Sequence, residues 1–269
     1  MSHLQELESR SIYLIREMAE RYGADKVAML WSMGKDSTTL LWLARKAFLG
    51  ALPFPVVHLD TGCKFEAMYA YREQWAREWG LDLRIVRNQT ALDAGMGPHK
   101  GKLACCGALK TDTFKHAITD LGLKAVYLAI RRDEHGVRAK ERFVSPRAAD
   151  FKWQYQDQPL ELFDQYADAP AEEGGHVRVH PILDWSELDV WEYIRAEKIP
   201  VIDLYFAKDG KRYRSIGCRP CTSPIASDAA DLDKVIAELQ ASPAGERDGR
   251  AQDKEDEAAM QKLRALGYM

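Results

Sequence analysis

The chain has 269 residues, 46% hydrophobic and 29% charged, which is enough for one large α/β domain or a domain with a sizeable appendage. Its formal net charge of −3 gives no electrostatic reason to expect a nucleic acid or an anionic membrane as partner. Residues 1–10 are polar and no segment reaches about 18 uninterrupted apolar residues, so we expect a cytoplasmic protein without a membrane span.

Strand-like and helix-like segments alternate through the first half of the chain. Apolar runs predict strands at 27–31, 54–60, 81–86 and 125–130, and helical spacing predicts helices over 4–22, 38–48, 64–79 and 109–121. This alternation predicts an α/β fold with a parallel twisted sheet, right-handed crossovers and helices on both faces. Ligands of such sheets bind beyond the carboxyl ends of the strands, where the turn at 32–37 and Asp60 fall.

The pattern changes after about residue 145. We therefore expect one domain over residues 1–145 and a mixed C-terminal extension over 146–269 that binds substrate or a partner. Residues 177–182 predict a short strand, and Ser186 is the candidate N-cap of a helix whose Trp and Ile side chains pack in the core. The last part of 229–267 predicts a solvated helix.

The most informative stretch is the turn after the first predicted strand, which reads Ser32, Met33, Gly34, Lys35, Asp36 and Ser37. Backbone N–H groups at a helix start have no internal partners and attract phosphate. Gly34 allows close approach of the backbone, Lys35 adds a positive charge, and the two serine hydroxyls can donate to phosphate oxygens. A Walker A loop is excluded, because it needs a glycine where this chain has Met29. An ordinary capped turn is the alternative.

A second group of cations follows the predicted strand at 125–130, namely Arg131, Arg132, Arg138, Lys140 and Arg142. Several cations on a short loop suit a small anionic substrate or a negative charge that develops during a reaction. Acidic residues lie among them, at Asp133, Glu134 and Glu141. A salt-bridged surface is therefore the alternative interpretation.

These segments resemble the ATP pyrophosphatase superfamily, whose phosphate loop reads S-x-G-K-D-S. Within its phosphoadenylylsulfate reductase branch they resemble the small, ATP-binding subunits of bacterial sulfate adenylyltransferases. The matching segments are 32–37, 44–48, 52–55, 58–61, 131–134, 138–142, 185–191 and, more loosely, 246–250. The resemblance implies an adenine nucleotide alpha hydrolase-like fold, with residues 1–145 as the ATP pyrophosphatase-like domain. It also implies a nucleotidyltransferase that transfers AMP from ATP to sulfate, giving adenylyl sulfate and pyrophosphate.

The resemblance further implies roles for single residues. The catalytic group would be Lys35, Asp36, Arg131, Arg132 and Arg138, with Asp36 acting through Mg²⁺ and the arginines holding sulfate or the leaving pyrophosphate. ATP would be bound by Ser32, Gly34, Ser37 and Asp60. Positioning and charge neutralisation can carry attack on the α-phosphate without a covalent intermediate. A separate GTPase large subunit would drive the unfavourable equilibrium.

Four of the five cysteines form a tandem pair and a Cys-x-x-Cys motif, Cys105 with Cys106 and Cys218 with Cys221. Such thiolates can ligate zinc or an iron–sulfur cluster, whereas cytosolic disulfides are rare. The pattern resembles the ligands of the [4Fe–4S] cluster in adenylyl sulfate reductases, which favours such a cluster over zinc, and it departs from the usual sulfate adenylyltransferase subunit. Incidental thiols are the alternative. Cys63 is expected to be a packed thiol.

Three functions remain open. Sulfate adenylylation by a cluster-bearing small subunit is the first. The second is an iron–sulfur ATP pyrophosphatase that delivers sulfur to a nucleic acid, by phosphorothioation or tRNA thiolation. The third is a nucleotide or redox sensor without catalysis. Direct reduction of adenylyl sulfate is disfavoured, because that mechanism needs a nucleophilic cysteine near the C-terminus and no cysteine follows Cys221.

Overall fold

A six-stranded sheet forms the centre of the molecule, with strand order β3-β2-β1-β4-β8-β5. The computed structural model describes residues 1–134, 136–153, 158, 161–162, 165–166 and 174–241. The strands are β1 Val27–Leu30, β2 Val56–Leu59, β3 Leu83–Val86, β4 Ala125–Tyr127, β5 Val144–Arg147 and β8 His176–Val179. Every residue of β1, β2, β4 and β8 is buried, as expected for strands covered on both faces.

Most neighbouring strands of this sheet are parallel, which confirms the predicted fold class. β1 pairs with β2 through Leu30 and Val57 and with β4 through Ala28 and Val126. The exception is β5, which pairs antiparallel with β8, with Val144 opposite Val179. β8 therefore lies between β4 and β5, and the sheet takes strands from both sides of residue 145. The division of the chain at that residue stays a prediction.

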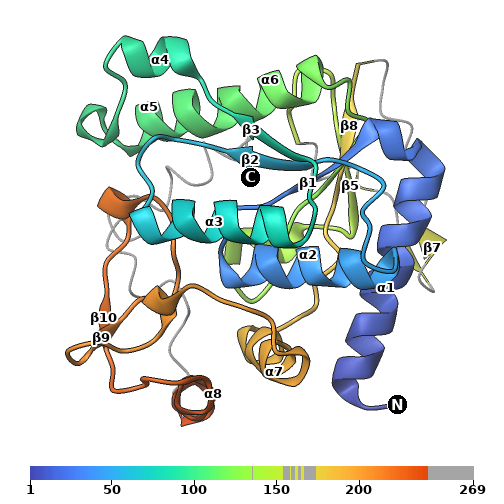
Figure 1. The fold of residues 1–269 in the computed structure, drawn as a ribbon. Coiled ribbons are helices and arrows are strands. Elements are labelled where there is room, and N and C mark those ends of the chain that lie inside the picture. The colour runs from blue at the N-terminus through green and yellow to red at the C-terminus, as the bar shows by residue number, and fades with distance from the viewer. Residues whose placement is uncertain (135, 154–157, 159–160, 163–164, 167–173, 242–269) are drawn as a thin grey trace.

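Helices cover both faces of the sheet (Figure 1). They are α1 His3–Tyr22, α2 Lys35–Ala47, α3 Glu66–Glu78, α4 Gln89–Asp93, α5 Lys102–Cys106, α6 Thr113–Asp120, α7 Glu187–Glu197 and α8 Leu232–Ala241. In Figure 1, α2 and α3 lie below the sheet and α1 runs along its right side, while α4, α5 and α6 lie above it. α7 packs against α2, which brings a helix from the C-terminal half next to the predicted phosphate loop. No described helix is both long and apolar enough to cross a membrane.

Shorter elements connect these helices and strands. Single turns of 3-10 helix cover Ala24–Lys26, Pro98–Lys100, Gly136–Lys140, Asp203–Tyr205 and Arg219–Cys221, and Gly107–Asp112 is π-helical. Two pairs of two-residue strands are β6 Glu161–Leu162 with β7 Gln165–Tyr166 and β9 Lys211–Arg212 with β10 Ile225–Ala226. π-helical turns often occur at functional sites. The π-helical turn here directly follows Cys106.

The structure moves several predicted boundaries for local reasons. α2 begins at Lys35 rather than at residue 38, because Gly34 adopts the extended backbone of an N-cap. Ser186 caps α7 through a reciprocal capping box with Asp189, which confirms its predicted role. Trp191 of that helix is fully buried, as predicted. Most of the predicted C-terminal helix lies outside the described residues.

Candidate active site

A cavity opens at the carboxyl ends of β1, β2 and β4, the edge where the strand pattern predicted a ligand site. Its walls come from the 32–37 turn, from the ends of the three strands and from the segment 215–217. The charged and polar lining residues are Ser32, Asp36, Ser37, His58, Lys64, Lys110, Glu134, Arg138, Tyr205 and Ser215. Both halves of the chain therefore contribute to one site.

The turn at residues 32–37, the predicted phosphate loop, is closed by the hydroxyl of Ser37. Its Oγ accepts a hydrogen bond from the Ser32 N–H at 3.2 Å and donates to the Gly34 carbonyl at 3.1 Å. Met33 holds a φ of 63°, a left-handed conformation that is uncommon outside glycine and asparagine. The Lys35 N–H, at the start of α2, donates to the Tyr205 hydroxyl at 2.8 Å. This tyrosine thus accepts a hydrogen bond from the N-terminus of α2.

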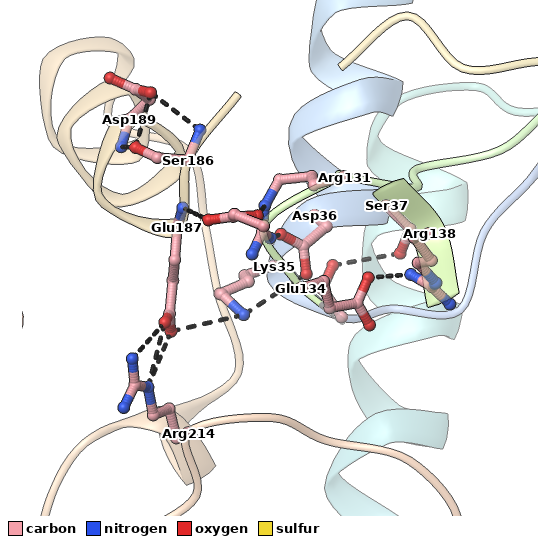
Figure 2. A network of polar contacts seen from close by, with 12 residues as sticks. Lys35, Asp36, Ser37, Arg131, Glu134, Arg138, Ser186, Glu187, Asp189 and Arg214 are labelled. Atoms are coloured by element: carbon pink, nitrogen blue, oxygen red, sulfur yellow. Dashed lines mark hydrogen bonds and ion pairs between the residues drawn. The ribbon is translucent and has the colours of Figure 1, made fainter. Parts of the chain in front are cut away.

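The side chain of Lys35 does not line the cavity, although the motif predicted that it meets phosphate. It is 1% exposed and lies behind the loop, with Nζ 3.4 Å from Asp36 Oδ2 and 3.7 Å from Glu187 Oε1 (Figure 2). Asp36 also forms an ion pair with Arg131. Asp36 lines the cavity and is therefore the link between the ligand site and these buried cations.

A chain of polar contacts continues from Arg131 to α7 (Figure 2). The Arg131 guanidinium is fully buried and donates to Asp133 Oδ1 at 3.0 Å. Asp133 Oδ2 then accepts the Glu187 N–H at 2.7 Å, at the N-terminus of α7. The Glu187 carboxylate accepts from Arg214 Nη2 at 2.7 Å and Nε at 3.0 Å. The network ties the loop after β4 and the C-terminal half to the phosphate loop.

The three predicted arginines separate in the structure. Arg138 lines the cavity and pairs with Glu134. Arg131 is fully buried and pairs with Asp36 and Asp133. Arg132 pairs with Asp184 and stands over the Phe143 ring, 5.4 Å from its centroid, and it is not among the residues that line the cavity. Only Arg138 of the three therefore contacts the described cavity.

Asp60 is buried beside the site without lining it. It accepts hydrogen bonds from the Gly62 N–H at 2.8 Å and the Tyr69 hydroxyl at 3.0 Å, and it forms an ion pair with Arg87. Burial alone would raise the pKa of this carboxyl, but these donors outweigh burial and hold the pKa below its ordinary value. Asp60 is thus a charged anchor for the loop that follows β2.

Several cavity residues were missed by the sequence analysis. Lys64 follows the strand β2, Lys110 lies in the π-helical turn, and Tyr205 and Ser215 come from the C-terminal half. Lys110 could have been noticed from its position, because the π-helical turn that contains it begins directly after the tandem cysteines. His58 was included only within a matching segment. Its Nδ1 lies 3.0 Å from the Trp31 carbonyl, and burial lowers its pKa to about 4.

The five cysteines are free thiols. They lie near one another, because Cys105 interacts electrostatically with the other four. The Arg219 N–H donates to the Cys63 carbonyl at 2.7 Å, so Cys63 lies next to the Cys-x-x-Cys segment. Burial, and then the neighbouring cysteines of both motifs, raise the pKa of the Cys105 thiol to about 11. Among the described side chains, however, no three His, Cys, Asp or Glu residues stand at metal-ligand spacing. The structure brings the predicted thiols together without forming a closed ligand shell.

Comparisons with known proteins agree with this architecture. Residues 26–224 match the phosphoadenosine phosphosulfate reductase domain family. The chain is 38% identical to sulfate adenylyltransferase subunit 2 of Proteus mirabilis (strain HI4320), covering 100% of this chain and 98% of that protein. It is also 38% identical to sulfate adenylyltransferase subunit 2 of Allorhizobium ampelinum, covering 99% and 93%.

Solved structures show the same fold at low sequence identity. Phosphoadenylyl-sulfate reductase from Candida auris has a TM-score of 0.55 at 14% identity, covering 82% of this chain and 98% of that chain. FMN adenylyltransferase from Candida glabrata, in complex with FAD and inorganic pyrophosphate, has a TM-score of 0.55 at 16% identity, covering 82% and 65%. At these identities the likeness concerns the fold alone.

Proposed function

The chain belongs to the phosphoadenosine phosphosulfate reductase domain family and, within it, to the sulfate adenylyltransferase subunit 2 proteins, and from this premise we propose that it transfers AMP from ATP to sulfate. The products are adenylyl sulfate and pyrophosphate. The observation that carries this proposal is the full-length similarity to proteins of that name, combined with a phosphate loop that lines a cavity. The expectation from the sequence motifs agrees with both.

The cavity supplies the groups that such a transfer needs. A sulfate oxygen attacks the α-phosphorus of ATP, a bond forms between them, and pyrophosphate leaves with its electron pair. Ser32, Ser37 and the α2 N-terminus would bind the phosphates, and Arg138, Lys64 and Lys110 would neutralise the charge that builds on the leaving group. Phosphate oxygens would replace two present contacts, the Glu134 carboxylate on Arg138 and the Tyr205 hydroxyl on the Lys35 N–H.

Residues behind the loop would position it rather than contact substrate. Lys35 and Arg131 hold Asp36 from the buried side, so we assign them to loop geometry and electrostatics. Arg132 and Asp60 remain predicted site residues that would act through their neighbours. Asp36 and Glu134 line the cavity and are carboxylates, the ligand type that Mg²⁺ prefers, so they fit a metal bound together with the phosphates. Mg²⁺ would supply charge neutralisation there.

A partner subunit follows from the names of the relatives, which are called subunit 2. We propose that a GTPase large subunit couples GTP hydrolysis to the unfavourable formation of adenylyl sulfate. The cytoplasmic location is likewise a prediction.

The cysteines support a second candidate, an iron–sulfur enzyme that delivers sulfur to a nucleic acid. The thiols adjoin the cavity, because Lys64 and Gly217 line it and are sequence neighbours of Cys63 and Cys218. In type and number the thiols fit a [4Fe–4S] cluster held by Cys105, Cys106, Cys218 and Cys221, which would supply redox or sulfur chemistry. In the described part of the chain no three of them stand at ligand spacing. Iron, sulfide and zinc content after anaerobic purification tests this candidate, with Cys218→Ser as the variant that loses the metal.

The adenylyl transfer is tested by product identification. The protein, purified with its partner subunit, is incubated with ATP, Mg²⁺, GTP, ³⁵S-sulfate and pyrophosphatase, which removes one product and draws the reaction forward. Labelled adenylyl sulfate is the expected product. Its absence, with the protein folded and able to bind ATP, would overturn the proposal.

A further inference from the structure

Three tryptophan rings and one arginine form a cluster between α2 and α3, the two helices below the sheet in Figure 1. The Trp42 ring of α2 lies 5.9 Å from that of Trp79, which ends α3, and the Trp75 ring lies 5.0 Å from Trp79. The Arg45 guanidinium stands over two of these rings, 5.3 Å from the Trp42 centroid and 4.9 Å from the Trp79 centroid. All four side chains are partly exposed, and we call them the tryptophan-arginine patch.

The Arg45 side chain is held by these rings without a carboxylate beside it. It forms no ion pair with a described residue, and burial lowers its pKa without an opposing acidic neighbour. Of its nitrogens only Nε is both buried and without a hydrogen bond in the described part of the chain. The N–H groups of the two terminal nitrogens therefore face solvent. A guanidinium stacked on aromatic rings is already oriented, and its fork matches the two oxygens of a carboxylate.

The turn that ends α2 exposes an apolar side chain next to Arg45. Leu49 is 94% exposed and has a φ of 53°, a left-handed conformation that is uncommon for leucine. The Gly50 N–H donates to the Arg45 carbonyl at 2.7 Å, so this turn folds back onto the last turn of the helix. Strained residues of this kind cluster at functional sites. Leu49 thus extends the patch with apolar surface.

Ligand binding in the cavity does not explain the patch. Residues 44–48 form one of the segments through which the chain resembles sulfate adenylyltransferase small subunits, and none of them lines the described cavity. The patch adjoins the cavity through a single ring, because Trp31 lines the cavity and lies 6.3 Å from Trp79. A surface that contacts another macromolecule is the remaining role for exposed tryptophan and arginine side chains in this arrangement.

We propose that the tryptophan-arginine patch and Leu49 form the docking surface for the partner subunit. A carboxylate of that subunit would bind the Arg45 guanidinium, and apolar side chains beside it would cover the rings and Leu49. This inference rests on the proposed function, because that function supplies the partner subunit. Tryptophan and arginine are the residues in which the binding energy of interfaces concentrates. The structure therefore predicts an acidic residue flanked by apolar ones on the partner.

Two substitutions test the surface, and a third is the matched control. Arg45→Gln removes the charge and the fork. Leu49→Asn removes the apolar side chain at a position where asparagine tolerates the left-handed backbone. Arg77→Gln is the control, because Arg77 is an exposed arginine of α3 outside the patch. The measurement is the Kd of each full-length chain for the separately purified GTPase large subunit, by calorimetry.

Arg45→Gln is expected to weaken binding of the large subunit by about 30-fold or more, the size typical of a central interface residue. Arg45→Lys keeps the charge without the fork, so its Kd should fall between those of the wild type and Arg45→Gln. Leu49→Asn should weaken binding about three- to tenfold, and Arg77→Gln by less than about twofold. Thermal melts and the Kd for ATP should match the wild type in every variant.

An unchanged Kd for the large subunit in folded Arg45→Gln, or an equal loss in Arg77→Gln, would overturn the inference while leaving the proposed function intact. Self-association of the chain that Arg45→Gln abolishes, without an effect on the large subunit, would assign the patch to a second copy and also overturn it. The proposed function is judged separately, because a wild-type complex that forms but makes no adenylyl sulfate would overturn that function alone. A wild-type chain that binds no large subunit would overturn the proposed partnership and this inference together.

Discussion

Glu187→Gln tests the buried network that supports the phosphate loop. The carboxylate accepts two hydrogen bonds from Arg214, at 2.7 Å and 3.0 Å, and lies 3.7 Å from Lys35 Nζ. Glutamine keeps the shape but removes the charge. The donor of both bonds is still a charged guanidinium in the variant, so what is lost is the attraction between opposite charges at a buried site, about 2–3 kcal/mol in total. This total includes the loss at Lys35, which is 1% exposed.

The assay is urea unfolding, with thermal melting as a second measurement. We expect Glu187→Gln to lower the free energy of unfolding by about 2–3 kcal/mol, which corresponds to a melting temperature lower by roughly 5–10 °C. Glu192→Gln on the same helix is the matched control, because among the described residues its carboxylate accepts only a 3.5 Å contact from Gln240. The control should stay within about 0.5 kcal/mol of wild type.

A Glu187→Gln variant as stable as the control would refute the reasoning, because a buried carboxylate that balances two cations cannot be neutralised without cost. A double-mutant cycle with Arg214→Gln sharpens the test. The coupling energy should be about 1 kcal/mol or more. A coupling near zero would mean that the contact in the structure contributes nothing to folding.

Two further predictions concern the cavity and the buried histidines. Lys110→Ala should weaken ATP binding by roughly 10–100-fold, since a charged contact contributes about 1.5–3 kcal/mol. Lys115 lies over the Phe151 ring outside the cavity, so Lys115→Ala should leave the Kd for ATP unchanged. Equal effects of the two substitutions would contradict the placement of Lys110 at the cavity. Burial lowers the pKa of His58 and His180 to about 4 and that of His176 to about 2, so the unfolded chain takes up these protons near 6.5 but the folded protein does not. Stability should therefore be full above about pH 6.5 and fall as the pH decreases toward 5, by up to about 4 kcal/mol per pH unit for the three groups; equal urea midpoints at pH 7 and 5 would contradict this.

The fold could be predicted where local sequence sets local structure. Buried strands of a parallel sheet read as apolar runs, and β1 and β2 were found within such runs. Ser186 was recognisable as an N-cap because a serine directly precedes a segment with a helical pattern, and the structure adds its capping box with Asp189. The antiparallel pairing of β5 with β8 was missed, because strand order depends on contacts between distant segments and not on local pattern.

The sequence predicted the cavity residues of the 32–37 turn but not those that other segments contribute, namely Lys64, Lys110, Tyr205 and Ser215. Motif and strand end placed Ser32 and Ser37 at the cavity, since both positions follow from a strand, a turn and a helix start. The Lys35 side chain is placed by its ion pair with Glu187. The Lys35 N–H is bound by the hydroxyl of Tyr205, which lies 170 residues later in the chain. Neither partner leaves a signal in the local sequence. A motif therefore identifies the residue types at such a turn, while tertiary contacts decide which of their side chains line the cavity.

The most direct test of the proposed function is pyrophosphate release from ATP by the anaerobically purified protein with its partner subunit, measured with and without sulfate. Release that depends on sulfate and yields one adenylyl sulfate per pyrophosphate is the predicted result. Release indifferent to sulfate, or release that begins only when a nucleic acid is added, would contradict adenylyl transfer to sulfate and favour sulfur delivery instead.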